Sequence, residues 1–303
     1  MNISVASTAA KNKKAILWMI SYAAAISGMH VCVRLVSEDM HPFQIVFFRN
    51  IFGLIAVIPW FIKLGTKPLR TNKFGMLLTR AIINTFAMLG FFMAVSIIPL
   101  AEVTTLTFTA PIFATLLAVL FFNERIGVWR AVAIIFGLAG TFVVLRPGFN
   151  EISFGQLIAL GSAFSWAICI IVIKILGRTE SSPTITTYMS LFMAPLTLFP
   201  ALLVWTSPSL EQIMWLLLLG TLGGVGQLTL TESLRLGETH VVTPFDFTRL
   251  IFISILGYIL FDQVPDIFVW VGSVMIIGSI AFIAWREHFH SLDKTNRKSN
   301  PMN

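Results

Sequence analysis

Ten apolar runs of about 20 residues each divide the chain, and this division limits its fold more than any motif does. An α-helix of that length crosses the hydrocarbon core of a bilayer. Short segments with proline, glycine or charge separate the runs, as turns between helices would. We therefore predict an all-α integral membrane protein with ten transmembrane helices. The predicted spans are 15–36, 43–62, 74–97, 102–122, 128–145, 152–173, 183–205, 212–234, 241–261 and 267–285.

The composition supports a protein embedded in membrane lipid and argues against a nucleic-acid partner. Hydrophobic residues make up 56% of the 303 residues and charged residues only 12%, whereas soluble domains carry about 25% charged residues. The formal net charge is +7, but the lysines and arginines fall in short clusters between the apolar runs rather than in one stripe. Whether the chain works alone or as a homodimer stays open.

The charges between the spans predict how the helices are oriented. If the N-terminus lies in the cytoplasm, the inner segments hold 15 of the 21 lysines and arginines, and the outer loops hold only Arg146. The outer loops carry acids instead: Glu38, Asp39, Glu151, Glu211, Asp262 and Asp266. Short loops with this bias set orientation strongly. We expect a multi-pass protein of the cell membrane, the inner membrane of a bacterium, with both termini in the cytoplasm.

A weak internal similarity indicates that the ten spans form two sets of five. Residues 90–102 resemble residues 226–238, and residues 121–124 resemble residues 260–263. Because five is an odd number, a second set enters the membrane from the opposite side, which is the inverted-repeat plan of many secondary transporters. We expect an N-terminal cytoplasmic tail over 1–14, a first five-helix repeat over 15–146, a second over 152–286, and a basic cytoplasmic C-terminal tail over 287–303.

Four local stretches, taken with this topology, resemble the EamA-like family of the drug/metabolite transporter superfamily. They are Phe47-Phe48-Arg49, Thr109-Ala110-Pro111-Ile112-Phe113 followed by Phe122-Asn123-Glu124-Arg125, Gly137-Leu138-Ala139-Gly140, and Ser165-Trp166-Ala167. The resemblance covers roughly residues 15 to 286. It implies two five-helix halves, secondary transport and a small-molecule substrate.

Two stretches resemble a branch of the superfamily that includes S-adenosylmethionine uptake carriers. They run from His41-Pro42-Phe43 to Arg49, and from Thr243-Pro244-Phe245 to Pro265-Asp266. One position departs from the family pattern, because the ninth span ends in Asp262-Gln263, which shifts the acid by one residue. Neighbouring branches carry other metabolites, so the resemblance implies a metabolite carrier without fixing its substrate.

Charged residues inside the spans point to a substrate site. An arginine or aspartate at the centre of a membrane helix costs about 2.5–3.5 kcal/mol, so each needs a compensating role. Arg49 and Arg80 have no acid close in the sequence, whereas Asp246 and Arg249 lie one turn apart and could neutralise each other. We expect Arg49 or Arg80 to bind an anionic group and Asp246 to bind an amine. Arg49 could instead hold the fold, and Arg34, near a span end, could snorkel to the interface.

Polar residues near these charges extend the candidate site. Asn84 lies one turn from Arg80 on the same helix face, Trp166 could stack on a flat or cationic group, and Gln227 follows glycines that allow close approach. The candidate substrate-binding residues are Arg80, Asn84, Arg49, Asp246, Arg249, Trp166 and Gln227. Glu102, His30 and Glu232 are the candidates for proton coupling. His30 could instead serve packing, and Glu232 could pair with Arg235.

Other classes of function find less support in the sequence. It has no metal-ligand spacing and no glycine-rich phosphate loop followed by Lys-Ser or Lys-Thr. Cys32 and Cys169 lie in apolar runs, where we expect them to pack. We therefore expect no catalytic residue, no metal and no cofactor. The predicted function is alternating-access transport of a zwitterionic or carboxylate-bearing metabolite, such as an amino acid or an S-adenosylmethionine-like compound. An integral-membrane enzyme and a broad-specificity exporter are the alternatives.

Overall fold

Apolar helices account for the regular structure of the described residues. The computed structural model describes residues 2–55, 69, 71–122, 128–146, 151–177, 179–180, 182–236 and 242–299. Within these ranges the chain is helical and has no strand. The helices are α1 (Asn2–Val36), α2 (Pro42–Ile55), α4 (Phe74–Ile97), α5 (Leu100–Thr107), α6 (Ala110–Phe122), α7 (Val128–Leu145), α8 (Phe154–Leu176), α9 (Ser182–Leu202), α10 (Leu210–Leu236), the 3₁₀ helix η2 (Thr243–Phe247), α12 (Thr248–Phe261) and α13 (Ile267–Ser299).

Each of the ten predicted spans falls on a helix or on a pair of consecutive helices. The predictions 74–97 and 128–145 have the same bounds as α4 and α7. The prediction 43–62 is described only as far as residue 55, where α2 ends, and its remainder lies outside the described residues. Among the described residues, five helical segments are long and apolar enough to cross a membrane: Lys13–Val36, Phe74–Ile97, Leu100–Leu120, Phe154–Ile173 and Leu210–Leu234. The all-α prediction is therefore confirmed for the described part of the chain.

Two of the spans contain an interruption. α5 ends at Thr107 and α6 begins at Ala110, one residue before Pro111. A proline inside a helix removes a backbone hydrogen bond, which explains why the helix is interrupted there. The ninth span begins as the 3₁₀ helix η2 and changes to α-helix at Thr248. In contrast, α9 continues through Pro195 and Pro200.

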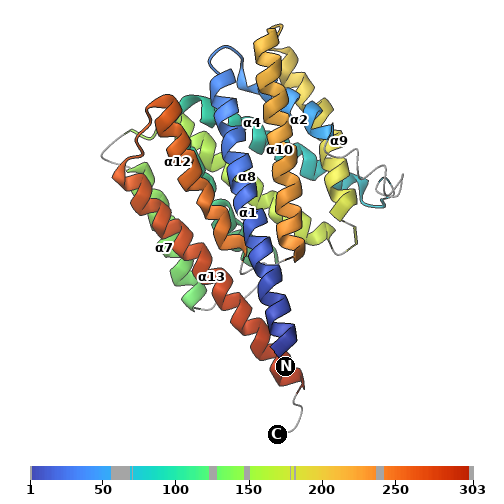
Figure 1. Ribbon diagram of the computed structural model, residues 1–303, viewed down its shortest axis with the longest axis vertical. Coiled ribbons are helices and arrows are strands. Elements are labelled where there is room, and N and C mark those ends of the chain that lie inside the picture. Colours follow the sequence, from blue (N-terminus) through green and yellow to red (C-terminus); the bar gives the residue numbers. More distant parts are fainter. Residues whose placement is uncertain are drawn as a thin grey trace.

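The helices pack in pairs with small residues at the contacts. α1 lies along α10, α4 along α8, α2 along α9, and α7 along α13. Figure 1 shows α7 and α13 side by side, and it places the start of α1 and the end of α13 at the same end of the bundle. A Cβ added to Gly226 of α10 would lie 2.7 Å from Ile26 Cδ1 of α1. Between helices in lipid, such close backbone approach supplies much of the packing.

The contact between α7 and α13 is the tightest backbone approach of this kind. A Cβ on Gly140 would lie 2.9 Å from the carbonyl oxygen of Gly272. A Cβ on Gly272 would lie 2.7 Å from the carbonyl oxygen of Gly140. Real Cβ atoms do not come this close to backbone atoms, so only glycine fits at both positions.

Arg34 has a structural role that differs from the expected snorkelling. Its Nη1 donates to the carbonyl oxygens of Val95, at 2.7 Å, and Ile98, at 3.4 Å. These carbonyls lie at the C-terminal end of α4, where they lack intrahelical partners and where the helix dipole favours a cation. Arg34 therefore ties α1 to the end of α4.

Candidate functional site

Arg80 and Asn84 project from α4 toward α9 and form the first part of the candidate site. Nη1 of Arg80 donates to the carbonyl oxygen of Ile185 at 3.2 Å, and Nη2 lies 3.4 Å from the sulfur of Met189. One turn later, Nδ2 of Asn84 lies 3.0 Å from the sulfur of Met193. The spacing of four residues on α4 thus matches the spacing of four on α9. Both methionines were missed at the sequence level, because apolar residues in a span give no signal of a polar contact.

Trp166 of α8 completes this part of the site. Its indole Nε1 donates to Oδ1 of Asn84 at 3.2 Å, so the indole ring is held in one orientation. The ring centroid lies 5.2 Å from that of Phe91, which in turn lies 4.7 Å from the ring of His30 in α1. The structure therefore brings the candidates Arg80, Asn84 and Trp166 together and connects them through Phe91 to His30.

The guanidinium of Arg80 is buried with too few partners. The side chain is only 8% exposed, and its Nε has no hydrogen-bond partner. None of the described carboxylates lies within ion-pair distance of it. A carbonyl oxygen and a thioether sulfur, which is a weak acceptor, do not neutralise a buried cation. Because an unpaired buried charge is costly, this position is suited to an anionic ligand group.

Arg49 projects from α2 toward α1 and α10. It is partly buried, and its Nη1 donates to Oδ1 of Asn50 at 3.1 Å. A Cβ on Gly223 of α10 would lie 3.6 Å from Nε of Arg49, so this glycine leaves room for the guanidinium. Arg49 therefore faces protein, as expected for a cation in a membrane span.

Asp246 and Arg249 form a third charged group at the junction of η2 and α12. Nη2 of Arg249 lies 3.7 Å from Oδ2 of Asp246, so the expected neutralising pair forms, although it is long. Oδ1 of Asp246 and Nε of Arg249 are both buried without a partner, as is Nδ1 of His30. The guanidinium also lies 4.8 Å from the ring centroid of Phe108. Unsatisfied donors and acceptors so close together can receive a polar ligand.

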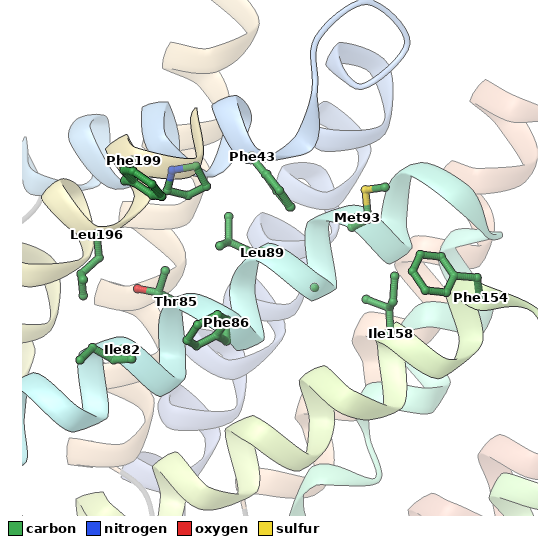
Figure 2. A pocket seen from close by; sticks show the side chains of 12 residues that line it. Phe43, Ile82, Thr85, Phe86, Leu89, Met93, Phe154, Ile158, Leu196 and Phe199 are labelled. Carbon is green, nitrogen blue, oxygen red and sulfur yellow. The ribbon is translucent and has the colours of Figure 1, made fainter. Parts of the chain in front are cut away.

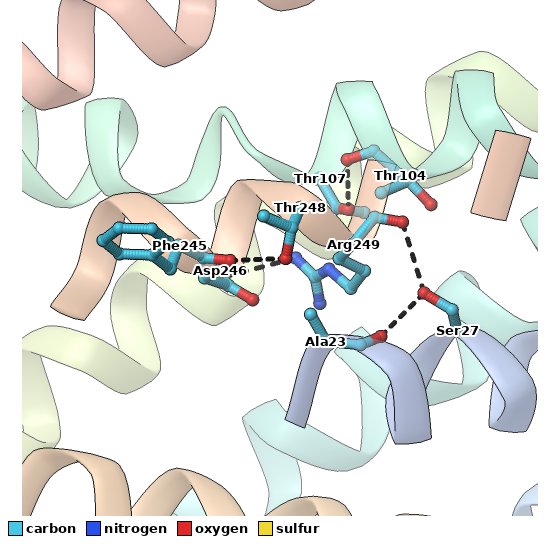
Figure 3. Close-up of polar contacts among 8 residues, drawn as sticks. All are labelled: Ala23, Ser27, Thr104, Thr107, Phe245, Asp246, Thr248 and Arg249. Carbon is cyan, nitrogen blue, oxygen red and sulfur yellow. Dashed lines mark hydrogen bonds and ion pairs between the residues drawn. The ribbon is translucent and has the colours of Figure 1, made fainter. Parts of the chain in front are cut away.

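Figure 3 shows how this charged group sits against its neighbours. Arg249 lies between α1, represented by Ala23 and Ser27, and α5, represented by Thr104 and Thr107. Ser27 Oγ donates to the backbone carbonyl oxygen of Arg249 at 3.2 Å. The start of α12 is thus tied to α1 close to His30.

The remaining candidates lie nearer the ends of the helices. Glu102 accepts a hydrogen bond from Nε2 of Gln156 and lines a polar cavity of about 190 Å³. An ion pair between Arg146 and Asp266, at 2.7 Å, lies beside it. The hydrogen bond from the backbone N–H of Phe268 lowers the pKa of Asp266 most, and the hydrogen bond from Arg146 lowers it further. Sequence reasoning placed Arg146 and Asp266 on one side of the membrane but did not pair them.

The last two candidates, Gln227 and Glu232, both lie on α10. Gln227 is exposed on α10, one residue after the glycine that packs on α1. Glu232 is partly buried four residues before the end of the same helix. Its expected pairing with Arg235 falls on a side chain outside the described ones.

An apolar cavity lies apart from these polar groups. It has a volume of about 710 Å³ and is lined by α2, α4, α8 and α9. Figure 2 shows Ile82, Phe86 and Leu89 of α4 along it. Thr85 is its one hydroxyl, and that hydroxyl donates to the carbonyl oxygen of Ala81 at 2.9 Å. The lining suits hydrocarbon and gives a polar metabolite no partner.

Comparison with known proteins places the chain among transporters. A model of the EamA-like transporter family matches twice, over residues 13–146 and 153–285. The riboflavin transporter of Vibrio cholerae is 27% identical over 88% of this chain and 91% of its own length. The S-adenosylmethionine uptake transporter of Rickettsia bellii is 26% identical over 89% of this chain and 93% of its own length.

A solved crystal structure has the same fold. It superposes with a TM-score of 0.60 over 93% of this chain and 98% of its own, at 18% sequence identity. At that identity the likeness concerns the fold alone.

Proposed function

Because the chain belongs to the EamA-like transporter family, we propose that it is a secondary carrier of a zwitterionic or carboxylate-bearing metabolite in a bacterial inner membrane. Its family and named relatives make it a membrane transporter of a small molecule and not an enzyme. The observation that carries the more specific proposal is the guanidinium of Arg80, which is buried without a described carboxylate partner. A substrate carboxylate would supply the missing charge through two parallel hydrogen bonds.

The neighbouring groups fit the other parts of such a substrate. Trp166, oriented by Asn84, offers an aromatic face for a flat or cationic group. Asp246 has a free carboxylate oxygen for an amine, and Arg49 provides a second cation. An S-adenosyl compound combines a carboxylate, an amine, a cationic sulfur and a flat base. This combination agrees with the substrate named for one relative, the S-adenosylmethionine uptake transporter of Rickettsia bellii.

The helix pairing supports two inverted repeats, over residues 15–146 and 152–286. Exchanging the halves relates α1 to α8, α2 to α9, α4 to α10, and α7 to α13. The contact of α1 with α10 then becomes that of α8 with α4, and both occur in the structure. The contacts of α2 with α9 and of α7 with α13 relate to themselves, and both occur. Such symmetry allows two equivalent conformations that open to opposite sides of the membrane.

Proton coupling would use groups that the halves share. Glu102 of the first half is hydrogen-bonded to Gln156 of the second, and Nδ1 of His30 is buried without a hydrogen-bond partner. Glu232 is a third candidate, near the end of α10. An inward proton gradient should therefore raise substrate accumulation in reconstituted vesicles.

Reconstitution tests the proposed function directly. Purified protein in liposomes should accumulate labelled S-adenosylmethionine or a neutral amino acid saturably and without ATP, with and without an imposed pH gradient. Empty liposomes give the background. Transport of riboflavin without either zwitterion would contradict the assigned substrate class, and no flux of any of the three would contradict a carrier of this kind.

Asp246→Asn should show how much the substrate amine contributes to binding, apart from the substrate carboxylate. The substitution keeps the size of the side chain but removes its charge, so the KM of an amine-bearing substrate should rise about tenfold, the value of one charge-assisted hydrogen bond. The KM of an analogue without the amine should stay the same. Asp266→Asn is the matched control, because Asp266 is the other described aspartate in an ion pair and its partner is Arg146 rather than a proposed substrate-binding residue. Equal effects on both substrates would contradict the role of Asp246.

A further inference from the structure

Asn50 is a buried polar residue in α2 and is not one of the proposed substrate-binding residues. Its side chain is 4% exposed. Oδ1 accepts from Nη1 of Arg49 at 3.1 Å, and Nδ2 donates to Oγ1 of Thr197 in α9 at 3.4 Å. We infer that Asn50 is a positioning residue that holds the guanidinium of Arg49 for the substrate and connects it to α9. The inference rests on the proposed carrier function.

The geometry of a helix makes the contact between Arg49 and Asn50 informative. Neighbouring residues of a helix point in different directions, so their side chains do not normally meet. Nη1 of Arg49 reaches Oδ1 of Asn50 while its Nε lies 3.6 Å from a Cβ placed on Gly223 of α10. The guanidinium is thus held against protein on two sides. The contact therefore selects one of the many conformations of a long arginine side chain.

The direction of each hydrogen bond fixes the amide of Asn50. A guanidinium only donates, so it requires the amide oxygen and excludes the amide nitrogen. Oγ1 of Thr197 donates its own hydrogen to the carbonyl oxygen of Met193 at 2.7 Å, which leaves a lone pair for Nδ2 of Asn50. The three bonds run in one direction, from Arg49 through Asn50 and Thr197 to the carbonyl oxygen of Met193, and such chains strengthen their members.

Two consecutive turns of α9 support both cationic parts of the site. Thr197 receives the bond from Asn50, and Met193, one turn earlier, receives the contact from Asn84. Both α9 residues are fully buried. The positions of Arg49 and of the group formed by Arg80, Asn84 and Trp166 are therefore set relative to one rigid element. The distance between these two groups would therefore select substrates by their length.

Asn50→Asp tests positioning without removing volume. The new carboxylate would pair with Arg49 and neutralise the charge meant for the substrate. We expect the KM of a carboxylate-bearing substrate to rise about tenfold or more, with little change in the maximal rate and no loss of thermal stability. The corresponding methyl ester should be much less affected. Asn50→Ala should also raise KM, because it frees Arg49.

Thr197 provides the matched controls. Thr197→Ser keeps the hydroxyl and should keep the wild-type KM, whereas Thr197→Val should raise KM in the same direction as Asn50→Ala. A wild-type KM in both Asn50 variants, measured with an active wild-type protein, would overturn the inference and leave the carrier function standing. Absence of transport by the wild type itself would overturn the proposed function instead.

A measurement independent of transport tests the bonds themselves. The losses in melting temperature from Asn50→Ala and Thr197→Val should not add in the double variant, because the two residues share one hydrogen bond. Additive losses would overturn the connection between α2 and α9, whatever the substrate is.

Discussion

Arg80→Ala is expected to lower kcat/KM for the transported metabolite by about 100-fold or more. Removing one partner of a buried ionic hydrogen bond costs about 2–5 kcal/mol, and each 1.4 kcal/mol is about tenfold. Folding should be less affected, since the guanidinium of Arg80 contributes one bond to a carbonyl and one contact to a sulfur. Removing an uncompensated buried cation also relieves a cost. The measurement is uptake into liposomes at several substrate concentrations.

Two further variants separate charge and geometry from general damage. Arg80→Lys keeps the charge but loses the planar pair of donors, so it should recover only part of the activity. Arg34→Gln removes an arginine that likewise donates to carbonyl oxygens between helices. It should lower the melting temperature and leave KM unchanged. Wild-type uptake by Arg80→Ala would remove Arg80 from the substrate site.

Gly272→Ala should produce the second large effect, a loss of stability. The added methyl would lie 2.7 Å from the carbonyl oxygen of Gly140 and would overlap Cγ2 of Val144. Because backbone atoms form one side of this contact, α7 and α13 would have to separate, and overpacking of this kind costs about 1–3 kcal/mol. The melting temperature of the purified protein and its monodispersity in detergent measure the change.

Gly278→Ala is the matched control, since it lies in the same helix with nothing within 4 Å of its added methyl. There the better helix propensity of alanine, about 1 kcal/mol, should leave stability equal or higher. If the two variants melt at the same temperature, close approach of the two backbones does not stabilise the pair.

Helix positions could be predicted because the length and hydropathy of each span can be read from its own residues, without knowledge of the helices that it contacts. The bounds of α4 and α7 follow from hydropathy alone, and Pro111 marks the interruption between α5 and α6. The 3₁₀ start of the ninth span, Thr243–Phe247, could not be predicted, because hydropathy does not distinguish a 3₁₀ helix from an α-helix. Its geometry depends on neighbours from other parts of the chain.

The candidate site was predictable only one helix at a time. Charge in an apolar run identified Arg80 and Arg49, and helical spacing added Asn84. Hydropathy does not reveal which helices meet, so the bond from Trp166 to Asn84 across 82 residues became visible only in three dimensions. Asn50 was passed over because a neutral amide next to an arginine gives little signal, and its partner Thr197 lies 147 residues away.

The two interrupted helices also have a mechanical consequence. A helix bends most easily where its regular α-helical hydrogen bonding is broken or changes type, and the two such points lie in contact here. Phe108, at the end of α5, packs edge-on against Phe247, at the end of η2, with ring centroids 5.0 Å apart. Arg249 lies over the ring of Phe108. A ligand that pulls on Asp246 and Arg249 would therefore act on the α5–α6 junction and the η2–α12 junction at the same time.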